Sequence, residues 1–127
     1  MSSIPRNKAI VVVEDDRLLA DLIRDALETE PHYHAVAVRD GARALGVVRA
    51  IKASLVLLDL NLPGLNGLQI YDLLQKDSAT RDIPVIFVTA NHQSQALRDR
   101  GITNIIPKPF ELDDLLSRVA EVFALPQ

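Results

Sequence analysis

Short apolar runs alternate with longer amphipathic stretches along this sequence, and that alternation restricts the folds open to it. The apolar runs, rich in Val, Ile and Leu, cover residues 8–13, 33–38, 55–58, 83–88 and 103–106. Stretches with helical character follow them, over residues 16–28, 40–51, 68–76, 91–100 and 111–124. Strands that alternate with helices in this way indicate a parallel sheet covered on both faces. We therefore predict an α/β fold, a doubly wound five-stranded parallel sheet, as a single domain over residues 1–127.

The first helical stretch, over residues 16–28, has one apolar stripe and a clear signal at each end. Its apolar residues fall on one helical stripe, which consists of Leu18, Leu19, Leu22, Ile23, Ala26 and Leu27. Asp16 precedes the stripe and is a favoured helix N-cap, and Glu30-Pro31 ends the helix.

Composition excludes several classes of protein. A chain of 127 residues with 48% hydrophobic content can bury a core, and its net charge of −3 gives no basic surface for nucleic acid. The absence of Cys excludes disulfides and thiolate chemistry, which suits a reducing compartment. No secretory signal is visible, and no apolar run approaches the roughly 18 residues of a membrane span. We expect a cytoplasmic domain that binds neither nucleic acid nor membrane.

Polar residues end four of the predicted strands. They are Glu14 and Asp15, Asp59, Thr89, and Lys108. Because the carboxyl ends of parallel strands meet at one edge of the sheet, and ligands bind beyond that edge, we expect these side chains to lie together.

Together these residues can hold a divalent cation, a carboxylate nucleophile, a hydroxyl and an ammonium group. Carboxylate oxygens suit Mg²⁺, and a cation would relieve the repulsion that Asp59 meets beside Glu14 and Asp15. A carboxylate can then act as a nucleophile and form an aspartyl phosphate. Each residue also has an ordinary interpretation, because acids cap helices and form turns.

Thr89 and Lys108 complete the predicted site. Lys108 lies between two prolines that stiffen its loop, and Lys108-Pro109 is a candidate cis peptide bond. A hydroxyl and an ammonium group that face an aspartyl phosphate would bind its oxygens. In isolation, Thr89 would be a common strand residue and Lys108 an exposed turn residue.

These residues, taken in order, resemble the receiver domain of two-component response regulators, the CheY-like family. The resemblance covers nearly the whole chain, including the loop over residues 62–67 and the motif Lys108-Pro109-Phe110. It implies a flavodoxin-like (βα)5 fold with strand order 2-1-3-4-5.

The resemblance also implies roles for single residues. Asp59 corresponds to the phosphoacceptor, and Thr89 and Lys108 correspond to the switch hydroxyl and the phosphate-binding lysine. Glu14 and Asp15 correspond to the acidic pair, with Asp15 as the direct ligand of Mg²⁺. The backbone carbonyl of Asn61 corresponds to a further metal ligand.

Two features depart from the family pattern. The switch aromatic, three residues before the lysine, is Ile105 here. The segment between Thr89 and Gly101 is shorter than usual by about one helical turn, so we expect a short fourth helix. Both departures fall on the face through which many receivers dimerise or dock outputs.

The resemblance implies phosphorelay signal transduction. Asp59 would accept a phosphoryl group from a sensor histidine kinase or histidine phosphotransfer protein in a Mg²⁺-dependent reaction. We expect a phosphoprotein that is not an enzyme with a separate substrate. We expect no output domain in this chain, so that it acts on a downstream partner or a missing output domain. We also expect a monomer, with at most weak dimerisation on phosphorylation. Two alternatives stay open: a pseudo-receiver that docks partners without phosphorylation, and a flavodoxin-like flavin carrier, which the acids at the first strand end disfavour.

Overall fold

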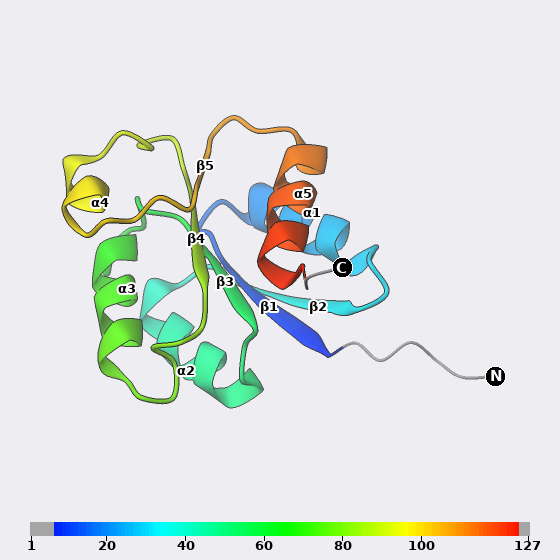
Figure 1. Cartoon of the computed structure of the whole chain (residues 1–127), viewed down its shortest axis with the longest axis horizontal. Coiled ribbons are helices and arrows are strands. Elements are labelled where there is room, and N and C mark those ends of the chain that lie inside the picture. Colours follow the sequence, from blue (N-terminus) through cyan, green and yellow to red (C-terminus); the bar gives the residue numbers. More distant parts are fainter. Residues whose placement is uncertain (1–6, 125–127) are drawn as a thin grey trace.

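The computed structural model describes residues 7–124, which form a five-stranded parallel sheet with strand order β2-β1-β3-β4-β5 (Figure 1). The strands are β1 (Lys8–Val13), β2 (Tyr33–Val38), β3 (Leu55–Leu58), β4 (Val85–Thr89) and β5 (Ile105–Pro107). The predicted fold class and strand order are therefore confirmed. The ends of the predicted domain, residues 1–6 and 125–127, lie outside the described residues.

Helices cover both faces of the sheet, as a doubly wound fold requires (Figure 1). They are α1 (Arg17–Glu28), α2 (Gly41–Ile51), α3 (Gly67–Lys76), α4 (Gln95–Asp99) and α5 (Leu112–Phe123). Side chains alternate along β1, so that Ile10 and Val12 pack with α1 and α5. Val11 and Val13 point to the opposite face and pack with α2 and α3.

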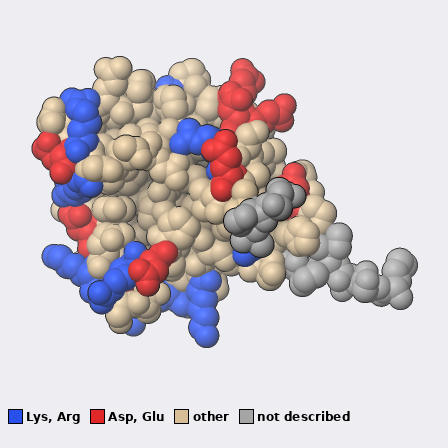
Figure 2. All heavy atoms as spheres, viewed as in Figure 1, with Lys and Arg blue, Asp and Glu red and all other residues tan. Residues whose placement is uncertain are grey.

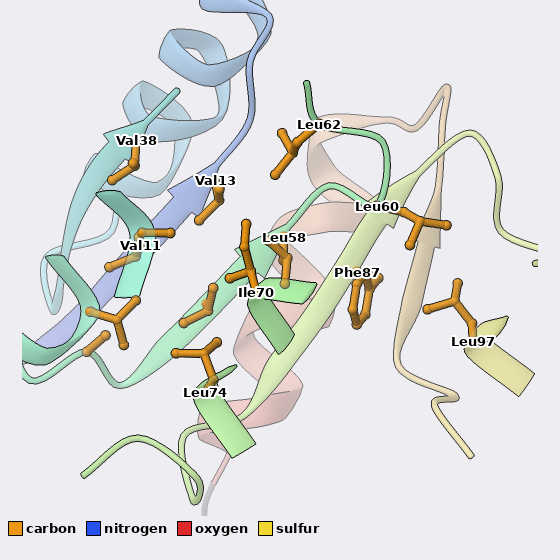
Figure 3. Close-up of a cluster of buried hydrophobic side chains, with 14 residues drawn as sticks. Val11, Val13, Val38, Leu58, Leu60, Leu62, Ile70, Leu74, Phe87 and Leu97 are labelled. Atoms are coloured by element: carbon orange, nitrogen blue, oxygen red, sulfur yellow. The ribbon is translucent and has the colours of Figure 1, made fainter. Parts of the chain in front are cut away.

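The core on the α2–α3–α4 face is continuous from strand to helix (Figure 3). Phe87 in β4, Ile70 and Leu74 in α3, and Leu97 in α4 are all fully buried. Leu60, the second residue after β3, joins the same cluster. The loop after β3 is thereby anchored in the core, which fixes the position of Asp59 next to it.

Short polar signals set the helix starts. Asp16 is the N-cap of α1, and its Oδ1 accepts a hydrogen bond from the Leu19 amide at 3.2 Å. Asn66 and Gln69 form a capping box at the start of α3, with distances of 2.8 and 3.0 Å. Gly67 opens α3 against the Asp59 backbone, and a Cβ at this position would collide with the Asp59 carbonyl oxygen.

The segment after β4 differs from the prediction. We predicted a helix over residues 91–100, but α4 spans only Gln95–Asp99. Residues 91–94 form a turn instead, because the Thr89 hydroxyl accepts the Asn91 amide at 3.1 Å and the Asn91 carbonyl accepts the Ser94 amide at 3.3 Å. The last strand also begins later than predicted, at Ile105.

The apolar stripe of α1 is wider than the surface it buries. Ile23 and Leu27 lie in the core, as the pattern predicts. Leu18 and Leu22 belong to the same stripe but are 82% and 51% exposed. These two leucines form an apolar surface outside the core, close to the carboxyl edge of the sheet.

Within residues 7–124, none of the helices has the length and apolar character needed to cross a membrane. On the face seen in Figure 2, acidic side chains gather over the start of α5. Asp113 and Asp114 occupy the first turn of this helix, where negative charge is favourable.

Candidate functional site

The sheet brings four strand ends together at its carboxyl edge. Val13 lies beside Leu58 in the parallel register of β1 and β3, so Glu14 and Asp59 follow as neighbours. The Asp59 amide donates to the Val13 carbonyl at 3.1 Å. Thr89 pairs in register with Pro107, which places Lys108 next to the end of β4.

Three carboxylates form a cluster at this edge. Oxygen atoms of Glu14, Asp15 and Asp59 all lie within 4.8 Å of one another. Glu14 and Asp59 are only 3% and 6% exposed, whereas Asp15 is open to solvent. An all-oxygen donor set with one accessible ligand fits a hard cation such as Mg²⁺, which takes one or two carboxylates and keeps several waters. Asp16 lies outside the cluster and caps α1 instead.

Lys108 reaches into the acidic cluster from the end of β5. Its Nζ lies 2.5 Å from Glu14 Oε1 and 3.3 Å from Asp59 Oδ2. The three side chains are largely shielded from water, so their charges interact strongly. Lys108 therefore neutralises part of the negative charge that the two buried acids bring together.

The surroundings shift the pKa values of this pair. Burial raises the pKa of Glu14, although the hydrogen bonds from Lys108 and the Asp16 amide oppose that rise. Burial acts to lower the pKa of Lys108, but the hydrogen bond and the charge of Glu14, with the charge of Asp59, outweigh it and leave the pKa above its usual value. Lys108 is therefore an ammonium group at neutral pH.

Thr89 is fully buried at the end of β4. Its hydroxyl oxygen accepts the Asn91 amide at 3.1 Å, and its carbonyl accepts the Lys108 amide at 3.0 Å. The hydroxyl proton remains available to a new acceptor at the site. Thr89 and Lys108 are thus tied together through the backbone.

Asn61 lies beside Asp59 in the loop that follows β3. Its backbone amide donates to Asp59 Oδ1 at 3.2 Å, and the Leu60 carbonyl accepts the Gly67 amide at 2.9 Å. These bonds orient the Asp59 carboxylate and stiffen the loop. The predicted role of the Asn61 carbonyl as a metal ligand stays a prediction.

The segment around Lys108 contains two features that the sequence analysis singled out, a Lys-Pro peptide bond and Ile105. The Lys108-Pro109 peptide bond is cis, as its sequence suggested. Ile105 occupies the position of the family's aromatic residue and is half-buried against the core. Arg118 of α5 covers this end of β5, because its guanidinium donates to the Ile105 carbonyl at 3.2 Å and to Asn104 Oδ1 at 2.7 Å.

Sequence reasoning missed an apolar groove that opens beside the site. The groove has a volume of about 370 Å³ and includes Leu19 and Leu22 of α1, Pro109 and Phe110. Lys108 lies at its border with the acidic cluster. The breadth of the apolar stripe on α1 was the one signal in the sequence that could have revealed it.

A parallel sheet with this polar edge is characteristic of signalling domains of the receiver class. The similarity of this chain to known proteins supports the same class. The family model described as "Response regulator receiver domain" matches residues 10–120. The chain belongs to this family, whose members act in two-component signalling.

Individual relatives give the same result. The chain is 37% identical over 113 residues to the DNA-binding response regulator MtrA of Mycobacterium tuberculosis, covering 87% of this chain and 48% of MtrA. It is 32% identical to the polar-differentiation response regulator DivK of Brucella anthropi, covering 88% of this chain and 93% of DivK. The chain thus spans about half the length of MtrA and nearly all of DivK.

Among solved structures, the non-phosphorylated HemR receiver domain of Leptospira biflexa superimposes with a TM-score of 0.81. The two chains are 32% identical, and the match covers 94% of this chain and 97% of the other.

Proposed function

We propose that this domain is a phosphoacceptor and that Asp59 receives a phosphoryl group in a Mg²⁺-dependent reaction. The observation that carries the proposal is the convergence of Glu14, Asp15 and Asp59 within 4.8 Å, with Lys108 Nζ 3.3 Å from Asp59. A carboxylate nucleophile with cationic groups on both sides meets the electrostatic demands of phosphoryl transfer.

The acidic cluster would hold the metal ion. Glu14, Asp15 and Asp59 supply carboxylate oxygens, and the Asn61 carbonyl would complete the protein ligands. When bound, Mg²⁺ would neutralise the negative charge of the phosphoryl oxygens.

The remaining residues would bind the product. An Asp59 oxygen would form a P–O bond as the P–N bond of a phosphohistidine breaks, and the leaving imidazole would keep the electron pair. Lys108 can then move its hydrogen bond from Asp59 to a phosphoryl oxygen. The Thr89 hydroxyl, whose oxygen accepts the Asn91 amide, can donate a hydrogen bond to another phosphoryl oxygen.

A histidine kinase or histidine phosphotransfer protein would supply the phosphoryl group. Such a donor must contact the surface that surrounds Asp59. The groove between α1 and the loop after β5 adjoins Lys108 and includes Leu22, and Leu18, one helical turn earlier on α1, adds a further exposed apolar side chain. An exposed apolar patch of this kind is typical of protein interaction surfaces.

Output would be carried by a downstream protein or by a further domain, and this domain would act on no separate metabolite. Because Arg118 folds back onto Ile105, and α4 is a single short turn, we expect a monomer without phosphate. Light scattering, with and without beryllofluoride as a phosphate mimic, measures this. A tight dimer through α4, β5 and α5 would contradict it.

Mass spectrometry of the intact protein tests the proposed chemistry. Incubation with acetyl phosphate and Mg²⁺ should add one phosphoryl mass to the wild type and none to Asp59→Asn. The matched control Asp82→Asn changes an exposed aspartate elsewhere and should be phosphorylated normally. Absence of phosphorylation in the wild type would instead favour a pseudo-receiver that docks partners without phosphate.

A further inference from the structure

The outer edge of β2 is open over part of its length. Backbone groups of even-numbered residues in and next to β2 face β1: the Val38 carbonyl accepts the Glu14 amide at 3.0 Å, and the His32 carbonyl accepts the Lys8 amide at 3.1 Å. Odd-numbered residues therefore face outward, since the sheet order places β2 at its edge.

In the first half of this edge, the outward-facing amides already have hydrogen-bond partners. The Tyr33 amide donates to the Glu30 carbonyl at 3.1 Å, and the Ala35 amide donates to Glu28 Oε1 at 3.2 Å. The second half differs, because neither the amide nor the carbonyl of Ala37 has a hydrogen-bond partner in the described part of the chain.

The opposite edge of the sheet is protected in a way that β2 is not. β5 is only three residues long, and Pro107, which faces outward, has no amide proton. Arg118 covers the outward carbonyl of Ile105 at 3.2 Å. Short length, proline and a charged side chain are the devices by which proteins block unwanted strand pairing. β2 contains no proline, and no described side chain bonds the backbone groups of Ala37, so this edge can accept another strand.

Basic grooves flank Ala37 on both sides. One, of about 470 Å³, lies toward α1 and includes Arg17, Arg24 and Asp21. The other, of about 390 Å³, lies toward α2 and includes Arg43 and Val47.

The charge of these grooves is opposite to that of the chain. Arg39 lines both grooves, which together carry four guanidinium groups and two carboxylates, although the whole chain has a net charge of −3. Asp21 already pairs with Arg24 at 3.2 Å, and Asp40 accepts the Ala42 amide at 3.0 Å as the cap of α2. Arg39 and Arg43 form no ion pair with the other described residues. Both remain available to an external carboxylate.

We propose that the β2 edge at Ala37 binds an extended acidic peptide segment of a partner protein by strand addition. The peptide backbone would pair with the Ala37 amide and carbonyl. Its side chains would alternate between the two faces, so acidic residues would enter both grooves and pair with their arginines. A second copy of this chain is a poorer occupant, because its own surface beside Ala37 carries the same excess of arginines over carboxylates.

This surface is separate from the proposed phosphorylation site. β1 lies between β2 and β3, which leads to Asp59. Binding at Ala37 therefore does not depend on phosphorylation, and Asp59→Asn should bind the peptide like the wild type.

NMR of the full ¹⁵N-labelled chain tests the proposal. The probe is a blocked peptide of about six residues built from Glu-Glu and Val-Val pairs, so that Glu falls on both faces of the strand, and its Lys–Val counterpart serves as the charge-reversed control. The Glu–Val peptide should shift the Ala37 and Arg39 amide signals and slow exchange of the Ala37 amide, whereas the Lys–Val peptide should not.

Two variants separate backbone pairing from charge. The double variant Arg39→Gln, Arg43→Gln should weaken binding at least fivefold, whereas Lys76→Gln, Arg81→Gln, which removes the same charge from exposed positions on another surface, should not. Ala37→Pro removes the outward amide and should weaken binding in a chain that stays folded. The absence of shifts at Ala37, equal binding of both peptides, or shifts that grow with protein concentration alone would overturn the proposal.

Discussion

Lys108 and Glu14 lie 94 positions apart in the sequence, yet the lysine Nζ stands 2.5 Å from the Glu14 carboxylate. The contact crosses the carboxyl edge of the sheet and occupies an oxygen of the acidic cluster. A cation that binds the cluster must therefore compete with the Lys108 ammonium group for Glu14.

The first prediction follows from this competition. Lys108→Met should raise Mg²⁺ affinity several-fold, because it removes a positive charge from within hydrogen-bonding distance of two carboxylates. The same variant should be phosphorylated much more slowly, because the phosphoryl oxygens lose their ammonium partner. Mg²⁺ titration and the rate of mass gain with acetyl phosphate measure the two effects. Weaker Mg²⁺ binding in Lys108→Met would show that the lysine assists the metal site.

The adjacent acids Asp15 and Asp16 should separate metal binding from stability. Asp15→Ala should abolish most Mg²⁺ affinity and change the free energy of unfolding little, because Asp15 is exposed and belongs to the carboxylate cluster. Asp16→Ala should leave Mg²⁺ affinity nearly unchanged and lower the free energy of unfolding by about 1 kcal/mol, because it removes the cap of α1. Mg²⁺ titrations and urea unfolding of both variants decide this. Equal losses of affinity would show that the roles are misassigned.

A third prediction concerns the end of α2. Lys52 is the C-cap and has a φ of 52°, a left-handed conformation that favours glycine. Lys52→Gly should raise the free energy of unfolding by up to about 1 kcal/mol, because the relief of strain exceeds the added entropy of the unfolded chain. Urea unfolding measures this, and Lys76→Gly in α3 is the control, which should destabilise the protein. A loss of stability in Lys52→Gly would show that the lysine side chain makes a compensating contribution.

Much of the fold and site was predictable because both depend on strand positions. The apolar runs placed Glu14, Asp59, Thr89 and Lys108 at strand ends, and a parallel sheet has only one carboxyl edge. The proximity of these four residues therefore follows from topology without knowledge of side-chain rotamers. The roles assigned to them in phosphoryl transfer remain predictions.

Other features depend on contacts that no local pattern specifies. Lys108 pairs with Glu14 as well as with Asp59, because its side chain is long enough to cross the carboxyl edge of the sheet. The short fourth helix was expected, but its later start at Gln95 follows from the bond between Thr89 and Asn91, which competes with helix formation. The open backbone at Ala37 becomes visible only when the strand order and the partners of neighbouring amides are known.

The final prediction is that Ile105 does not act as a rotating gate. In the family, phosphate draws the switch hydroxyl inward and an aromatic ring fills the vacated space. Ile105 is β-branched and stiff at χ1, packs against the core, and has its carbonyl held by Arg118. A switch requires a free-energy difference between two conformations, and the loss of one coupled group should reduce it. The response to phosphorylation should therefore concentrate in residues 61–67 and 89–93.

Amide and methyl NMR shifts, compared between the free and the beryllofluoride-bound protein, measure this response. Large shifts are expected at Asn61 and Asn91, since the first donates to Asp59 and the second to the Thr89 hydroxyl. The Ile105 methyl groups should keep their rotamer, with small shifts along β5. Ile105→Tyr supplies the missing ring and should extend the response into β5, because the ring can follow the inward motion of Thr89. A rotamer change at Ile105 in the wild type, with large shifts along β5, would show that Ile105 acts as the moving switch residue although it is not aromatic.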